Sequence, residues 1–308
     1  MKKQNDTLWK GILEPFFYDF LLFVDPILAA TVDQGREIVF MDKELSQESP
    51  SENEIYEQKI VDKLVRLHTL DTNKEWILLH LEIQEKYNKD FGKRMYNYFN
   101  RLYIKYNVPI TAYAIFTEPN GIKRDNVFKV DCFGTTLRYT FNTYKIALQE
   151  ETLLMEHHNP FALVVLIAKL GALKKIYKDR QEYDRMLLEQ KIKIANLILE
   201  KQLPPEKERI LMNFLFYYVN FEFQKTKIKF DHKLNLLTNK NIQDMTIEEI
   251  LIGQARLQGK RQGEKKAKED EVSRLIRKQG LTNEEIVDFA ETSISLVKRV
   301  RKKIEIIN

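Results

Sequence analysis

Three residues with oxygen-bearing side chains, Asp62, Glu82 and Gln84, lie on two segments that predict the strands of one β-hairpin. The segments are Lys59–Leu70 and Lys74–Glu85, and the Asp-Thr-Asn sequence between them favours a tight turn. A turn centred on its threonine pairs residues whose numbers sum to 144, so Asp62 faces Glu82. Directly opposed residues share one face of the sheet, with Cβ atoms about 5 Å apart. Gln84 lies on that same face because side chains alternate along a strand.

This pair of opposed carboxylates predicts a divalent metal site. Like charges directly opposite one another destabilise a sheet unless a cation lies between them. Mg²⁺ suits the position because it takes oxygen ligands, binds through one or two carboxylates, and completes its shell with water and phosphate oxygens. The alternative is that Asp62 and Glu82 are solvated residues on an exposed face, as most acidic residues are. A register slip of one residue would separate the two carboxylates.

The composition excludes several other kinds of site. The chain has 308 residues and a single cysteine, Cys132, so it has no internal disulfide and no cysteine-built zinc site. No segment reaches the roughly 20 apolar residues that span a bilayer, and the N-terminus lacks the pattern of a signal peptide. We therefore expect a cytoplasmic protein that does not enter a membrane.

The excess positive charge is confined to the C-terminal part. Residues 251–308 hold 14 Lys and Arg against 9 Asp and Glu, whereas the charges of residues 1–250 cancel. A near-neutral body with a basic appendage favours a polyanionic partner, although a solvated helical surface would give the same composition.

The order of elements indicates an α/β (α+β) fold with a mixed sheet flanked by helices. An apolar helix near the N-terminus precedes the hairpin, and a helix over Asp90–Tyr106 and an apolar strand over Val108–Thr117 follow it. Helices dominate beyond residue 150. We therefore predict a first domain over 1–150, a helical region over 151–250 and a basic helical tail over 251–308.

Six segments within residues 6–118 form a recognisable set. They read DTLWKGILEPFFYDFLLF, FMDKEL, VDKLVRL, WILLHLEIQ, DFGKRMYNYFNRL and AIFTE. In order and spacing this set resembles the recombination-promoting nuclease and putative transposase family, which belongs to the PD-(D/E)XK nuclease superfamily. The resemblance implies a restriction-endonuclease-like core and a DNA endonuclease that uses Mg²⁺ or another divalent cation.

The resemblance also implies roles for individual residues. Asp62 matches the motif's aspartate, Glu82 its second acidic residue, and Glu14 the helical acidic residue that completes the metal site. Gln84 stands where the motif has lysine, and Val61 stands where it has proline. A neutral amide can only hydrogen-bond, so Gln84 would position the attacking water. Activation of that water would depend on the metal ion.

Two basic patterns are candidates for contacts with DNA phosphates. Arg94, Tyr98, Arg101 and Lys105 are spaced along one face of the helix after the hairpin. A solvated face with Arg–carboxylate pairs is the alternative.

The second pattern lies in the tail. Thr282 and Glu285 form a capping box at the start of two short helices that resemble a helix-turn-helix unit. Lys298, Arg299 and Arg301 of the second helix would face DNA; such a helical pair can also be a simple packing unit.

Two other classes of function remain open. A catalytically inactive nuclease fold could act as a DNA-binding or regulatory module through its tail. Alternatively, the helices over 159–223 could form a dimer interface, which would make the protein a homo-oligomeric assembly factor.

Overall fold

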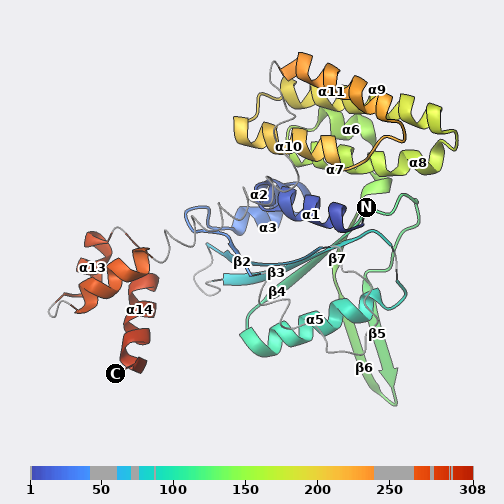
Figure 1. Cartoon of the computed structure of the whole chain (residues 1–308). Coiled ribbons are helices and arrows are strands. Elements are labelled where there is room, and N and C mark those ends of the chain that lie inside the picture. The colour runs from blue at the N-terminus through green and yellow to red at the C-terminus, as the bar shows by residue number, and fades with distance from the viewer. Residues whose placement is uncertain are drawn as a thin grey trace. The chain divides into compact units, whose positions relative to one another are not determined.

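The computed structural model describes residues 2–41, 61–70, 76–86, 88–238, 267–277, 281–290, 292 and 294–307. The chain divides into two compact units, residues 1–243 and 244–308. The first unit contains a β-sheet with helices on both faces, and the second is helical in its described part (Figure 1). The fold is therefore mixed α/β, as the order of elements predicts.

In the described ranges, five strands form a mixed sheet in the order β1-β2-β3-β4-β7. They are β1 (Val39–Phe40), β2 (Val61–His68), β3 (Trp76–Gln84), β4 (Ile110–Phe116) and β7 (Asn142–Lys145). The first three pair antiparallel, whereas β3, β4 and β7 run parallel. The carboxyl ends of the three parallel strands therefore meet at one end of the sheet.

The register of β2 with β3 confirms the sequence prediction. The Cα partners run from Val61 with Ile83 to His68 with Trp76, and every pair sums to 144. Asp62 is accordingly the partner of Glu82. The residues predicted to form the turn, 71–73, lie outside the described part of the chain.

Helices cover the two faces of this sheet (Figure 1). One face meets α1 (Lys2–Leu13), α2 (Phe17–Val24) and α3 (Pro26–Thr31), and the other meets α5 (Phe91–Tyr106). Because side chains alternate along a strand, neighbouring residues face opposite sides of the sheet. Val65 and Leu81 pack in the cluster that includes α1 and α2, whereas Leu64 and Leu78 pack against α5.

The sequence of α5 explains why it lies on the sheet. Phe91, Met95, Tyr98 and Leu102 recur every three or four residues and are all buried, forming one apolar stripe. The helix ends at Asn107, whose left-handed φ of 48° is a common helix terminus.

A layer of helices completes the first unit. It comprises α6 (Glu151–Glu156), α7 (Phe161–Lys169), α8 (Leu173–Ile176), α9 (Arg180–Glu200), α10 (Pro205–Tyr217) and α11 (Gln224–Thr238), with short 3₁₀ turns at Ile146–Leu148 and Leu170–Ala172. All residues from Phe161 to Ala168 are buried, so α7 is the central helix. Its side chains share one hydrophobic cluster with Trp9 and Val65. The predicted boundary at residue 150 therefore does not separate two units, because the sheet and these helices have a common core.

A separate hairpin of β5 (Val127–Cys132) and β6 (Thr135–Thr140) projects beyond α5 (Figure 1). Aromatic contacts hold its base on the helix. The Tyr96 and Phe128 rings stack with centroids 5.3 Å apart, and the Phe99 and Tyr139 centroids lie 4.9 Å apart.

The second unit has its own hydrophobic core. A helix over residues 267–277 packs with α13 (Asn283–Phe289) and α14 (Ile294–Ile307) around Val272, Ile286 and Val297. The predicted capping box is present: Thr282 Oγ1 accepts from the Glu285 amide at 3.2 Å, and Glu285 Oε2 accepts from the Thr282 amide at 2.7 Å. No helix in the described ranges has the length and apolar character needed to span a bilayer.

Candidate functional site

Glu82 is a buried carboxylate at the centre of the predicted site. Its side chain is 1% exposed on the face of β3 that meets α5, and its Cα partner on β2 is Asp62. Arg94 Nη2 donates to Glu82 Oε2 at 3.2 Å, and His80 Nε2 lies 3.4 Å from Glu82 Oε1. Within the described part of the chain, Oε1 accepts no hydrogen bond. The carboxylate therefore retains a buried oxygen that can accept a further partner.

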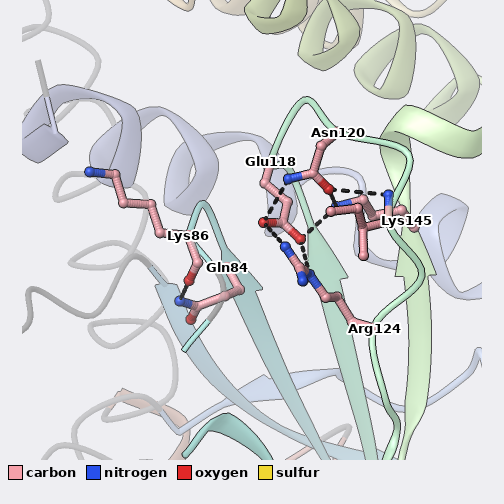
Figure 2. A network of polar contacts seen from close by, with 7 residues as sticks. Gln84, Lys86, Glu118, Asn120, Arg124 and Lys145 are labelled. Carbon is pink, nitrogen blue, oxygen red and sulfur yellow. Dashed lines mark hydrogen bonds and ion pairs between the residues drawn. The ribbon is translucent and has the colours of Figure 1, made fainter. Parts of the chain in front are cut away.

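Gln84 and Arg94 form the second half of this cluster. The same Arg94 Nη2 donates to Gln84 Oε1 at 2.8 Å, while the Gln84 amide donates to the Lys86 carbonyl oxygen (Figure 2). The guanidinium also lies over the Phe91 ring, 5.1 Å from its centroid. A residue near the start of α5 therefore supplies the positive charge that Gln84 itself lacks.

The donor set suits a hard divalent cation. Asp62 and Glu82 offer carboxylate oxygens, which Mg²⁺ prefers, and Mg²⁺ binds through as few as one or two of them. The buried Glu82 Oε1 without a hydrogen bond is the atom that fits such a ligand. Among the described side chains no three His, Cys, Asp or Glu residues form a metal-binding group, but the side chain of Asp62 is not among them.

Glu14 does not join this cluster, which corrects the prediction that it completes the metal site. Its Oε1 accepts from Lys63 Nζ at 2.6 Å. Lys63 neighbours Asp62 on β2, so alternation places it on the opposite face of the sheet. Lys63 is only 2% exposed, and a buried ammonium requires a counter-charge. Glu14 supplies that charge.

The Glu14–Lys63 ion pair should contribute measurably to stability. We expect Glu14→Gln to lower the free energy of unfolding by on the order of 3 kcal/mol, because it leaves the buried Lys63 ammonium without its carboxylate. Urea denaturation would measure the loss. If the Asp62–Glu82 pair holds Mg²⁺ as the sequence predicts, the Mg²⁺ affinity measured by isothermal titration calorimetry should stay unchanged in this variant, and a large loss of it would instead place Glu14 at the metal.

The predicted DNA-binding stripe of α5 divides into buried and accessible residues. Tyr98 is 2% exposed and packs edge-on against His80 with ring centroids 5.2 Å apart, so its predicted contact with DNA is wrong. Tyr98 lies four residues after Arg94, but it also continues the apolar stripe of α5 formed with Met95 and Leu102. Arg94 is 20% exposed, Arg101 is half-buried and Lys105 is exposed.

A buried ionic cluster that the sequence analysis missed lies where the parallel strands β4 and β7 end. Glu118 Oε1 accepts from Arg124 Nε at 2.5 Å and from Lys145 Nζ at 2.6 Å, and Oε2 accepts from Arg124 Nη2 at 2.8 Å. Asn120 bridges Lys145 and Glu118 through its two amide atoms (Figure 2). The cluster fastens the segment after β4 to β7. An acidic residue two positions after a buried strand, with a lysine at the end of another strand, is the signal that could have indicated this cluster.

The electrostatics of this cluster favour the ionised Glu118. Burial by itself would raise the pKa of the carboxyl, but the hydrogen bonds and charges of Arg124 and Lys145 outweigh it and lower the pKa of Glu118 to about 2. Burial lowers the pKa of Lys145, while its pairing with Glu118 opposes that shift.

The predicted DNA-binding residues of α14 have different environments. Lys298 is exposed, while the side chain of Arg299 lies outside the described set. Arg301 donates to Asn283 Oδ1 at 3.0 Å and to the Leu281 carbonyl at 3.3 Å, so it ties α14 to the start of α13. Arg301 therefore has a structural role within the unit.

Comparisons with protein-family profiles, with curated proteins and with solved structures found no match for this chain.

Proposed function

We propose that the first unit is a divalent-metal-dependent endonuclease that hydrolyses DNA phosphodiester bonds, with a restriction-endonuclease-like core and a role in recombination or transposition. The observation that carries the proposal is the β2–β3 register, which opposes Asp62 and Glu82 two residues before Gln84. A buried, incompletely hydrogen-bonded carboxylate beside an arginine is costly for a fold to maintain. Such an arrangement is typical of a site that binds a charged ligand.

The residues of the site would divide the work. Asp62 and Glu82 would hold the metal ion, which when bound polarises a phosphoryl oxygen and lowers the pKa of a bound water. Arg94 lies between Glu82 and Gln84 and can offer guanidinium donors to a phosphate, the group that arginine binds best. Both polar atoms of the Gln84 amide are hydrogen-bonded: the oxygen accepts from Arg94 and the nitrogen donates to the Lys86 carbonyl. The amide is therefore held in one orientation.

We expect DNA cleavage by this protein to require a divalent cation. Purified protein should convert supercoiled plasmid into nicked or linear DNA with Mg²⁺ or Mn²⁺ and should leave it intact with EDTA. The reason is that a carboxylate pair without a cation repels the phosphate. Gel electrophoresis of the plasmid measures the result. Equal cleavage with EDTA would contradict the proposed metal dependence.

The compact second unit supports one alternative, a catalytically inactive DNA-binding module. Its helices have a core of their own, and α14 carries the exposed Lys298. In that case wild-type protein would bind DNA in a salt-sensitive manner, deletion of residues 271–308 would abolish the binding, and no divalent cation would support cleavage.

A further inference from the structure

The turn between β5 and β6 contains an aromatic residue that the turn itself disfavours. Phe133 has φ of 42° and Gly134 has φ of 87°, so both central residues of this two-residue turn are left-handed. Such turns favour Asn, Asp or Gly at the first position. A bulky side chain there costs on the order of 1 kcal/mol. Phe133 is nevertheless fully exposed, at 106% of its reference area, and contributes no burial in return.

The strands behind this turn also carry features that the fold does not need. Lys129 and Arg138 are Cα partners, and like charges directly opposed destabilise a hairpin. Lys129 pairs with Asp131 at 2.8 Å, whereas exposed Arg138 makes no ion pair with any described residue. On the other face, Val130 is 44% exposed. The hairpin therefore presents a cation on one face and an aromatic ring at its tip.

The base of the hairpin is firmly attached to α5. Phe128 stacks on Tyr96, and a Cβ added to Gly92 would lie 3.3 Å from the Val127 carbonyl, so the helix and β5 approach closely. The same helix carries Arg94, which contacts Glu82. Helix α5 thus joins the projecting hairpin to the candidate site.

We propose that residues 127–140 form a DNA-binding arm, in which Phe133 stacks on an unpaired or unstacked base and Arg138 contacts a phosphate. The inference rests on the proposed function for its ligand class. Aromatic rings bind bases by stacking, and every base has a face that accepts one. A neighbouring unpaired cation is the group that contacts a phosphate. Lys129 and Arg138 are directly opposed, and Arg138 has no ion pair among the described residues, so the arm offers a positive charge that a polyanion such as DNA can neutralise.

Phe133→Asn separates a structural role of the ring from a binding role. Asparagine suits the left-handed position, so this variant should be at least as stable as the wild type in thermal unfolding. The binding of a fluorescein-labelled single strand, measured by fluorescence anisotropy in EDTA, should nevertheless weaken by roughly tenfold, the effect of losing one stacked base. Phe133→Trp should restore binding. Ile27→Gln, which removes another exposed apolar side chain, 82% exposed on α3, should bind as the wild type does.

Arg138→Gln tests the phosphate contact. We expect the slope of log affinity against log salt to decrease in magnitude by roughly 0.7 for the single strand. Unchanged affinity and slope in both variants would overturn the proposal, as would wild-type protein that does not bind DNA. A loss of self-association in Phe133→Asn, with DNA affinity unchanged, would also overturn it and would assign the hairpin to a contact between copies.

The absence of metal keeps this test independent of cleavage. If binding depends on Phe133 but no cation supports cleavage, the arm is supported and the nuclease proposal fails. If a divalent cation supports cleavage but both variants bind DNA as the wild type does, the nuclease proposal is supported and the DNA-binding arm is ruled out.

Discussion

Replacing Glu82 with glutamine should reduce the rate of Mg²⁺-dependent plasmid cleavage by roughly a thousandfold. The substitution preserves the size of the side chain, and its amide oxygen can still accept from Arg94, so the local packing should survive. It removes the negative charge that would hold the cation. A metal ion provides several kcal/mol of transition-state stabilisation, and each 1.36 kcal/mol corresponds to about tenfold in rate.

Two companion variants make this prediction specific. Asp62→Asn should cause a loss of similar size, and the double variant should be little worse than either single one, because residues that act as a unit are not additive. Glu182→Gln removes an exposed carboxylate of α9 and should cleave as the wild type does. Near-normal cleavage by Glu82→Gln, with thermal unfolding unchanged, would contradict the assignment.

Replacing Glu118 with glutamine should destabilise the first unit by about 3–5 kcal/mol. The change leaves the Lys145 ammonium, 7% exposed, and the Arg124 guanidinium, 16% exposed, without their shared carboxylate. Urea denaturation followed by circular dichroism would measure the loss. Glu156→Gln, which removes an exposed carboxylate of α6, should leave the free energy of unfolding within about 0.5 kcal/mol of the wild type.

The same cluster should make the wild type sensitive to acid. The pKa of Glu118 is about 2 in the folded protein against 4.5 for an ordinary glutamate. A lowered folded-state pKa gives stability that is fully present above pH 4.5 and lost as pH falls toward 2. That loss amounts to about 3 kcal/mol for this group. Glu118→Gln should lack this part of the acid-induced loss, and an identical pH dependence in both proteins would contradict the ionic description of the cluster.

Short-range sequence patterns predicted the part of the site that lies on two strands joined by a short turn. The Asp62–Glu82 register follows from turn position and strand alternation, both of which are encoded within a few residues. The capping box at Thr282 is equally local. The five-residue stretch that begins with Arg94 and ends at Tyr98 shows where such patterns fail. Helical spacing places Arg94 and Tyr98 on one face of the helix. Only the position of the sheet decides that the tyrosine ring is buried against His80.

Contacts between distant elements could not be predicted. Glu14 and Lys63 are 49 residues apart, and their pairing depends on which face of the sheet the first helices cover. The Glu118–Lys145 pair requires β4 and β7 to lie side by side in parallel, a pairing that alternation in either segment does not specify. The common core of the sheet and α7 likewise arises from packing, whereas the predicted boundary at residue 150 rested on the order of elements along the chain.

The most direct test of the metal site is a crystal of the protein soaked in Mn²⁺, examined by anomalous diffraction. We expect an anomalous peak within bonding distance of both the Asp62 and Glu82 carboxylates, and no peak there in Glu82→Gln crystals treated in the same way. A wild-type crystal with bound Mn²⁺ elsewhere and none between these two carboxylates would contradict it.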